Sequence, residues 1–397
     1  MRIVLVHNHY GSSAPSGENN VFQLEKKMLE SKGHEVLVYE RFSDEIRSKP
    51  IWGEFKGAIT TPWNFASSWE VSGLVRRFRP DILHAHNTFP LISPSIFSSA
   101  KGVGRVLTLH NYRLFCPSAI PMLNGKVCTQ CLDRRSVIPS LKHACYRGSR
   151  LATLPLALNV ALHRFIKTWE KNVDAFIALT KFQKRLMVDA GLLEERVFVK
   201  PNYYPGFPES VSFNKKGDYA VFVGRLSREK GVLSLIKAWR LWGDSAPELR
   251  IVGEGEMRAE LEALSIGLPI KFMGQVSESK AQEQIKFASL LILPSEWFEG
   301  FPMVFREAFA FGTPVATSNI GPLPSIVEDG RNGVIFRSGD PDSLLTVVRD
   351  VWAQKKRLEV MAQGARATFE ENYTETINYQ QLIGIYERAM QVRQGRK

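Results

Sequence analysis

The chain has 397 residues, of which 44% are hydrophobic, 11% aromatic and 23% charged. This composition is typical of a globular protein and excludes a disordered, collagen-like or coiled-coil chain, and the length suggests two or three domains. The 52 Lys and Arg residues exceed the 40 Asp and Glu residues, so the formal net charge is +12, which favours anionic partners.

No apolar run approaches the roughly 18 residues that a membrane-spanning helix needs. The N-terminus, MRIVLVHNHYG, lacks the charged start and the long apolar stretch of a secretory signal. We therefore expect a soluble cytoplasmic protein.

Short runs rich in β-branched residues alternate with stretches of helical periodicity along the chain. The strand-like runs are 2–7, 35–39, 81–86, 105–110, 174–179, 196–200, 219–224, 249–253, 270–274, 289–294, 314–317 and 333–336. The helical stretches are 18–32, 65–79, 181–190, 232–242, 256–266, 278–287, 303–311 and 341–356. Because the runs show no strict in-and-out alternation, they are typical of strands buried on both faces. The pattern predicts an α/β protein with parallel sheets covered by helices.

A break near 201–218 contains three prolines and two glycines and is typical of a linker. We expect two doubly wound, Rossmann-like domains, 1–203 and 204–374, with a cleft between them and ligands at the carboxyl ends of the strands. The last helical stretch begins at 375, and we expect residues 375–397 to pack back on the first domain.

The first turn between a strand and a helix, residues 7–20, contains Gly11 and Gly17, which let the backbone approach a ligand. It is not a G-x-G-x-x-G fingerprint. Gly253-Glu254-Gly255 also lacks the third glycine, so both are weak signals for dinucleotide binding.

All four cysteines fall within one stretch, an expected insert at about 112–150. They are Cys116, Cys128, Cys131 and Cys145, in the spacing C-x11-C-x2-C-x13-C. This spacing suits one tetrahedral, structural zinc. Reduced cysteines without metal and redox chemistry are the alternatives, and in a cytoplasmic protein metal binding is favoured over disulfides.

Eight Lys or Arg residues and a single acid, Glu170, lie between Arg134 and Lys171. Within this stretch, 154–171 alternates apolar residues with His163, Arg164 and Lys167. It is either a core helix with a basic outer face or a helix that lies on an anionic membrane.

Two cations follow the strand-like run 219–224, because Arg225 comes at once and Lys230-Gly231 precedes a helix. A helix start attracts phosphate, a guanidinium offers a fork and an ammonium offers a point charge. This arrangement suits two linked phosphates, and ordinary surface cations are the alternative.

The segment 294–315 carries two acids, Glu299 in a loop and Glu307 within the following helix, and Pro302 suits the first helical turn. Carboxylates are good acceptors for sugar hydroxyls. The alternatives are a solvated loop acid for Glu299 and a first-turn acid that complements the helix dipole for Glu307.

These motifs, in this order, resemble those of the family-four glycosyltransferases, which have the GT-B fold. The matching segments are Gly224-Arg225-Leu226 with Lys230-Gly231, the E-x7-E pair Glu299 and Glu307 inside EGFPMVFREAFAFGTPV, Lys200-Pro201-Asn202, and Ser16-Gly17-Glu18. Two departures are Ser16-Gly17, where the family usually has adjacent glycines, and Pro302, where many relatives carry glycine.

The resemblance implies retaining transfer of a sugar, of the hexosyl type, from a nucleotide-diphosphate donor. It implies that Gly224, Arg225 and Lys230 bind the diphosphate and Glu307 the ribose hydroxyls, while Glu299, with Gly300 and Phe301, faces the donor sugar. It also implies that Gly17 lies near the phosphates, Gly274-Gln275-Val276 beside the base, and His110 near the donor sugar.

No cofactor is expected to be required for catalysis, because the cations and helix dipoles stabilise the leaving diphosphate. The one D-x-D, Asp340-Pro341-Asp342, opens a helix and is interpreted as a cap. The expected acceptor is a glycan or a lipid-linked glycan of surface polysaccharide or glycoconjugate synthesis, with peripheral contact at the inner face of a membrane. The alternatives are another GT-B sugar-nucleotide enzyme, such as an epimerase, and a nucleic-acid-binding protein that uses the cysteines and the basic stretch, although no nucleic acid is expected.

Overall fold

The structure is a computed structural model that describes residues 1–11, 17–47 and 57–395. The chain divides into two compact units. Unit 1 contains Met1–Leu123, Cys128–Pro201 and Asn378–Lys397, and unit 2 contains Asn124–Val127 and Asn202–Ile377. The main division falls two residues before the boundary expected at 203, and most of the last helix is counted with unit 1.

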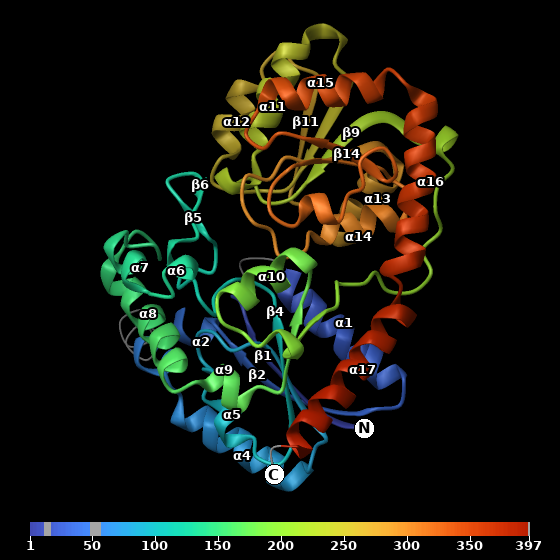
Figure 1. Ribbon diagram of the computed structural model, residues 1–397. Coiled ribbons are helices and arrows are strands. Elements are labelled where there is room, and N and C mark those ends of the chain that lie inside the picture. The colour runs from blue at the N-terminus through green and yellow to red at the C-terminus, as the bar shows by residue number, and fades with distance from the viewer. Residues whose placement is uncertain (12–16, 48–56, 396–397) are drawn as a thin grey trace. The chain divides into compact units, whose positions relative to one another are not determined.

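Unit 1 is built on six parallel strands in the order β2-β1-β3-β4-β7-β8 (Figure 1). The strands are β1 (Arg2–His9), β2 (Glu35–Phe42), β3 (Ile82–Asn87), β4 (Gly104–Leu109), β7 (Ala175–Ala178) and β8 (Val197–Val199). Each overlaps a predicted run. The strands β3, β4 and β7 are buried along their whole length, as in a sheet that is covered on both faces.

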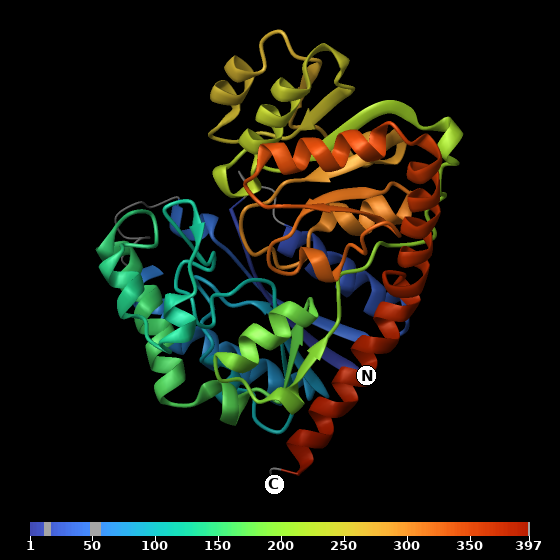
Figure 2. The ribbon, with the colours of Figure 1, turned by 45° about the horizontal axis from the view of Figure 1, so that its top comes forward.

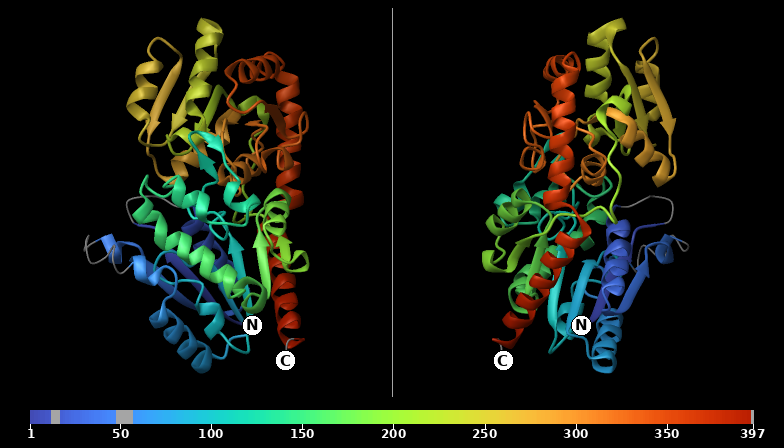
Figure 3. Two further views of the ribbon diagram at one scale, coloured as in Figure 1. Left: turned by 60° about the vertical axis from the view of Figure 1, so that its left-hand side comes forward. Right: turned by 90° about the vertical axis from the view of Figure 1, so that its right-hand side faces the viewer.

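The helices of unit 1 follow the predicted stretches and add several short ones. They are α1 (Gly17–Ser31), α2 (Asp44–Arg47), α4 (Phe65–Phe78), α5 (Ile96–Ser99), α9 (Thr168–Asn172), α10 (Lys181–Asp189) and α17 (Glu375–Gln394). Asn64 caps α4 and Thr180 caps α10 through their side chains. Figure 3 shows α1 and α17, at opposite ends of the chain, alongside the sheet of unit 1.

Unit 2 repeats the architecture with a second sheet of six parallel strands, in the order β11-β10-β9-β12-β13-β14. The strands are β9 (Gly217–Val223), β10 (Glu248–Val252), β11 (Ile270–Gly274), β12 (Ala288–Leu293), β13 (Val315–Ser318) and β14 (Gly333–Phe336). The helices are α11 (Val232–Trp242), α12 (Arg258–Leu264), α13 (Glu278–Phe287), α14 (Met303–Ala310), α15 (Pro341–Trp352) and α16 (Lys355–Asn372). In the view of Figure 2, α11 and α12 pack together, and α13 and α14 form a separate group near α16.

The strand orders determine where a ligand can reach each sheet. In unit 2, β9 pairs with β10 on one side and with β12 on the other, so later strands are added on the opposite side of β9. In doubly wound sheets, ligands bind at the carboxyl ends of the strands beside such a switch point. Arg225 and Lys230 follow β9, and Glu299 follows β12, so all three belong to loops at this point.

The insert between β4 and β7 contains elements that the sequence pattern only partly predicted. A small hairpin of β5 (Met122–Leu123) and β6 (Lys126–Val127) is followed by α6 (Gln130–Asp133), α7 (Ile138–Lys142) and α8 (Arg150–Phe165). The amphipathic stretch predicted at 154–171 is therefore two helices, α8 and α9. They are separated at Lys167, which adopts a left-handed backbone with φ of 58°.

The helix predicted at 341–356 is also two helices, since α15 ends at Trp352 and α16 begins at Lys355. Between them, Ala353 closes α15, and Gln354 precedes α16 with a non-helical backbone, φ −111° and ψ 73°. In the part of the chain that the structure describes, no helix is both long and apolar enough to cross a lipid bilayer.

Candidate functional site

The loops after β9 and β12 in unit 2 are held against each other by backbone contacts. Glu296 donates its backbone N–H to the Glu229 carbonyl at 2.9 Å. Gly231, the residue before α11, has φ of 69°, and a Cβ there would lie 1.9 Å from the Pro294 carbonyl oxygen. Only glycine tolerates both the backbone angle and this approach. The two loops that carry the predicted phosphate and sugar residues are therefore packed directly on one another.

Lys230 and Glu299 form the central ion pair of this loop pair. The Lys230 ammonium donates to Glu299 Oε1 at 2.7 Å, and the Ser295 hydroxyl and Trp297 indole N–H donate to the same oxygen at 2.6 Å and 3.0 Å. Glu299 is buried. The alternative interpretation of Glu299 as a solvated loop acid is therefore wrong, because three donors hold its carboxylate in place.

Arg225 is held through its guanidinium, yet more than half of its side chain is exposed. Its guanidinium donates to Glu229 Oε1 at 2.7 Å, and the Ser227 hydroxyl donates to the same oxygen at 2.7 Å. The side chain of Arg225 remains 58% exposed. A guanidinium has five N–H donors, so its remaining donors are free to bind an anion while Glu229 fixes its direction.

Glu307 is the fifth residue of α14 and is buried. The interpretation of Glu307 as a first-turn acid is wrong, because the first turn of α14 carries no acid. Pro302 precedes the first turn as the N-cap residue, where its missing N–H also costs nothing. Burial raises the pKa of Glu307 to about 7, although the neighbouring Arg306 guanidinium opposes the shift.

The glycines that were weak as dinucleotide signals have a packing role. A Cβ on Gly253 would lie 1.9 Å from the Gly224 carbonyl oxygen, and a Cβ on Gly255 would lie 2.2 Å from the Leu226 carbonyl oxygen. Gly224 also donates its N–H to the Val252 carbonyl at 3.0 Å. The glycines after β10 therefore let the loop that follows β10 pack closely against the loop that begins at Gly224.

The other predicted residues of unit 2 lie on adjoining loops. Val276 is half-buried between β11 and α13, and Gly300 and Phe301 follow Glu299, with Phe301 buried against the Tyr373 ring at 5.4 Å. Asp340 caps α15 by accepting the Ser343 N–H at 2.9 Å. This confirms that the D-x-D segment is a helix cap.

In unit 1, His110 directly follows β4 and lines an open pocket. Asn111, Arg113 and Trp169 also line this pocket. Gly17 is the first residue of α1, whereas Ser16 lies outside the described residues. The Asn111 amide donates to Glu18 Oε1 at 2.9 Å, so the start of α1 is tied to the segment after β4.

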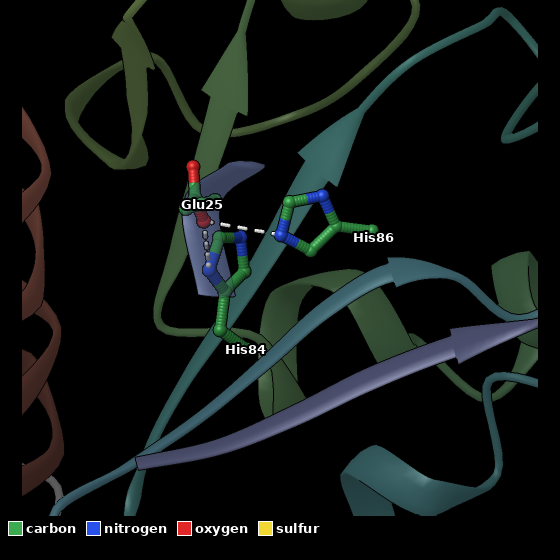
Figure 4. Close-up of side chains that lie close together, drawn as sticks. All are labelled: Glu25, His84 and His86. Carbon is green, nitrogen blue, oxygen red and sulfur yellow. Dashed lines mark hydrogen bonds and ion pairs between the residues drawn. The ribbon is translucent and has the colours of Figure 1, made fainter. Parts of the chain in front are cut away.

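A buried cluster beneath His110 was not predicted from the sequence. Glu25 Oε1 on α1 accepts a hydrogen bond from His86 Nε2 on β3 at 3.1 Å, and His84 Nδ1 on the same strand also lies 3.1 Å from that oxygen (Figure 4). The Lys200 ammonium lies 3.0 Å from the other carboxylate oxygen. His86 Nδ1 in turn lies 3.0 Å from His110 Nε2. The spacing of His84 and His86 was the available signal, because residues two apart on a strand face the same side.

Glu25, His84 and His86 place three possible metal-ligand atoms within 4.8 Å of one another. Burial alone would raise the pKa of Glu25, but Lys200 and the two histidines hold it well below its usual range. The ammonium already balances the carboxylate, and both ring nitrogens of each histidine have hydrogen-bond partners. The cluster is therefore a satisfied ion-pair network.

The four cysteines lie around one small cavity of unit 1, together with His143. All four are free thiols. Burial raises the pKa of Cys131 and of Cys145 to about 11. Across the described ranges of the chain, only the Glu25 cluster has three ligand atoms within 4.8 Å, so the sulfur atoms surround the cavity at wider spacing. The zinc site stays a prediction.

The basic helix α8 has an inner face that packs and an outer face that does not. Leu156, Val160 and His163 are buried, whereas Leu151 and Phe165 are 82% and 85% exposed. Arg164 points into the insert, where its guanidinium lies 5.6 Å from the Phe115 ring centre and donates to the Arg135 carbonyl. The expected core packing is present on one face only.

Two family models together match most of the chain. Residues 17–204 match the model described as Glycosyltransferase Family 4, and residues 205–368 match the one described as Glycosyl transferases group 1. The two matches meet within three residues of the division between units 1 and 2.

Among curated proteins, the sulfoquinovosyl transferase SQD2 of Arabidopsis thaliana is 25% identical over 380 residues, which is 90% of this chain and 68% of that protein. Two further relatives match over about half of their own length.

Among solved structures, sucrose-phosphate synthase from Thermosynechococcus elongatus covers 98% of both chains with a TM-score of 0.70 at 16% identity. Anabaena HepE in complex with UDP-glucose covers 98% of this chain and 100% of its own, with a TM-score of 0.64 at 17% identity. At these identities the likeness concerns the fold, which is the two-sheet architecture described above. The chain is a glycosyltransferase of the family-four type with the GT-B fold.

Proposed function

We propose that this glycosyltransferase moves a hexosyl group, with retention of configuration, from a nucleotide-diphosphate sugar to a hydroxyl of its acceptor. The observation that carries the proposal is the pair of loops after β9 and β12, which backbone contacts hold together at the switch point of unit 2. It holds a guanidinium, an ammonium and a buried carboxylate within one small region. That a solved relative of the same fold is described in complex with UDP-glucose supports a sugar-nucleotide donor.

Lys230 and Arg225 suit the diphosphate. An ammonium has three donors, and Lys230 uses one of them on Glu299, which leaves two for phosphate oxygens. Arg225 adds a fork at the neighbouring position, and the free N–H groups at the start of α11 add their dipoles. Glu299, anchored by Ser295 and Trp297, accepts a hydroxyl of the donor sugar.

In the proposed reaction, the bond between the anomeric carbon and the phosphate oxygen breaks, and its electron pair passes to the leaving diphosphate. The acceptor oxygen bonds to the same face of the sugar, and its proton passes to the leaving phosphate oxygen. Negative charge therefore grows beside Lys230 and Arg225, which stabilise it without reorganising. Gly17 and His110 of unit 1 are also proposed to act in donor binding, as the resemblance to family-four glycosyltransferases implies.

Replacing Lys230 by alanine should lower kcat by about 100-fold or more, because it removes a donor to the charge that develops on the leaving group. A panel of uridine, guanosine and adenosine diphosphate sugars first identifies the donor from the shift in unfolding temperature, since a bound ligand stabilises the folded state. Transfer with that donor is then measured.

Lys237→Ala is the matched control, because Lys237 is an exposed lysine on α11. It should keep both the thermal shift and the turnover. Near-normal turnover of a folded Lys230→Ala variant, or equal losses in the two variants, would contradict the role of Lys230.

Glu307 is proposed to accept the ribose hydroxyls, and its burial makes that role costly for stability. The folded pKa of about 7 lies above the ordinary value of 4.5. Between these two pH values the carboxyl group ionises more readily in the unfolded chain, so its contribution to stability is lost as the pH rises. A buried acid kept at this cost is typical of a functional residue.

Glu307→Gln should therefore stabilise the folded protein by less than about 1 kcal/mol at pH 5 and by up to about 3 kcal/mol at pH 8. The measurement is the free energy of urea unfolding of both proteins at each pH. A difference between the two proteins that does not grow with pH would show that Glu307 is not strained by burial. Donor binding by the variant should be weaker.

The acceptor is proposed to be lipid-linked, as in surface polysaccharide synthesis, and to be met at the cytoplasmic face of a membrane. The support is the outer stripe of α8, formed by Leu151, Leu154, Leu158 and Phe165. Contiguous exposed apolar surface marks an interaction site. No residue of α8 is acidic, and Arg147 and Arg150 are exposed at its start.

An anionic bilayer matches this stripe, because cations and apolar residues on one helix bind the headgroup boundary together. A second copy of the chain fits less well, since a two-fold contact would place the same cations against each other. A nucleic acid would meet the cations but not the apolar stripe.

The double substitution Leu151→Gln with Phe165→Gln should abolish binding to vesicles of equal parts phosphatidylcholine and phosphatidylglycerol. Leu241→Gln is the control, because Leu241 is 55% exposed on α11 of unit 2, and this variant should bind like the parent. Co-sedimentation measures both. Failure of the parent protein to bind these vesicles, or unchanged binding by the double variant, would remove the membrane proposal.

The cysteine cluster is proposed to hold one structural zinc ion, and no metal is assigned to the transfer reaction. Four thiols from a segment of 30 residues around one cavity, with an imidazole nearby, suit a tetrahedral site. Binding would require the raised thiol pKa values to fall, because thiolates are the ligands.

Protein purified without chelators should contain about one zinc ion per chain by elemental analysis. Removing it with a chelator should lower the unfolding temperature. Cys131→Ser should lose the metal, whereas Ser118→Ala, which changes the lining of the same cavity, should retain it. Parent protein with four reactive thiols and no zinc would favour reduced cysteines, and fewer than four thiols after denaturation would favour redox chemistry.

A further inference from the structure

The buried cluster beneath His110 contains one acid and one base that neutralise each other. Glu25 and Lys200 are both buried, and the ammonium lies 3.0 Å from Glu25 Oε2. Lys200 is held by Asn378 of α17, whose Oδ1 accepts at 3.1 Å and whose amide donates to the Pro201 carbonyl at 2.6 Å. The cluster is electrically balanced when its histidines are neutral.

Protonating a histidine here would add an unbalanced charge to a buried site, which is strongly unfavourable. Burial lowers the pKa of His84 to about 4, and it lowers the pKa of the nearby His7 to about 3. It also holds the pKa of His110 well below its usual range. Because Lys200 already balances Glu25, the charge balance of the cluster favours neutral imidazoles around Glu25, each with one N–H and one bare nitrogen.

The carboxylate then determines where each proton lies. An ionised carboxylate only accepts hydrogen bonds, so His86 must carry its proton on Nε2, which lies 3.1 Å from Glu25 Oε1. The other nitrogen of His86, Nδ1, is therefore bare. It lies 3.0 Å from His110 Nε2, and since a bare nitrogen accepts, His110 must donate from Nε2.

The remaining nitrogen of His110 is therefore an acceptor. Within residues 1–11, 17–47 and 57–395, Nδ1 of His110 makes no hydrogen bond and is not among the buried unpaired atoms. His110 lines the open pocket of unit 1. A bare, accessible nitrogen at this position favours a ligand group that carries a hydrogen and disfavours a carbonyl or phosphate oxygen.

We propose that Glu25 acts through His86 to fix His110 as the tautomer with its proton on Nε2, so that Nδ1 accepts a hydroxyl of the substrate. Glu25 and His86 are positioning residues in this arrangement, because both ring nitrogens of His86 are bonded within the cluster, to Glu25 and to His110. The tautomer is a property of unit 1 alone, whereas its consequence for turnover rests on the proposed transfer reaction.

The structure supplies a matched pair of variants. His84 and His86 lie on the same strand, are both buried and each place a ring nitrogen 3.1 Å from Glu25 Oε1. The second nitrogen of His84 faces the Thr108 hydroxyl at 2.8 Å, whereas that of His86 faces His110. Phenylalanine at either position keeps the ring volume and removes the nitrogen that faces Glu25, but only His86→Phe also removes the contact with His110.

Long-range proton–nitrogen correlation spectra of ¹⁵N-histidine-labelled protein report which ring nitrogen is protonated, and His110→Gln identifies the His110 signals. In the parent protein, the bare nitrogen of His110 should be Nδ1. His86→Phe should give a mixture of tautomers, and His84→Phe should leave His110 unchanged. His86→Asn, whose amide oxygen can accept in place of Nδ1, should restore the parent tautomer.

Turnover adds a second readout. His86→Phe should lower kcat by about tenfold, the effect of about one lost hydrogen bond, and His86→Asn should recover most of the loss.

Three results would overturn the proposal. The first is a parent His110 protonated on Nδ1, which would mean that His86 is an imidazolium. The second is an equal effect of His84→Phe on the His110 tautomer. The third is a folded His86→Phe variant that retains the parent tautomer. None of them depends on substrate, so an inactive preparation would count against the proposed function and not against the tautomer. If His86→Phe does not fold, the parent spectrum alone still decides.

Discussion

The candidate donor site depends on one close approach, that of Gly231 to the Pro294 carbonyl. A parallel sheet brings the ends of β9 and β12 to the same edge, but it does not make their loops touch. The missing side chain at Gly231 lets the backbones meet, and the hydrogen bond from Glu296 to Glu229 then fixes their register. The Lys230–Glu299 pair follows from this contact, because the joined backbones already place the two side chains within hydrogen-bond distance.

Several charges in both units are held in close ion pairs. Glu25 with Lys200, Arg105 with Asp174, and Lys230 with Glu299 each place a cation 2.7–3.0 Å from a carboxylate. Such pairs contribute little net stability compared with apolar residues of similar size, but removing one partner costs about 3–5 kcal/mol. What they supply is direction, since a paired side chain has one orientation. Glu307 lacks a close partner of this kind, because the Arg306 guanidinium lies 3.9 Å away, and its pKa rises accordingly.

The chemistry of the site was readable where it lies in continuous segments. Arg225, Lys230, Glu299 and Glu307 occur within short motifs beside strand ends, so their types and spacing pointed to phosphate and hydroxyl binding. The partners that orient them were less visible. Glu25 and Lys200 are 175 positions apart, and Asn378 lies further along the chain, on the helix that returns to unit 1. No local pattern connects such residues, because only the fold of the sheet brings them together.

The sequence by itself determined the strands, most of the helices, the linker between the units and the residues at the strand ends. These depend on local preferences, on burial from both faces and on turn residues, all of which are written in neighbouring positions. The tertiary structure alone decided that Glu299 is buried and accepts three hydrogen bonds, and that α8 has apolar residues on both its inner and outer faces. It also decided that a neutral cluster lies beneath His110. These properties depend on which distant surfaces meet, and the free energy of a buried polar group is set by the partners that it finds there.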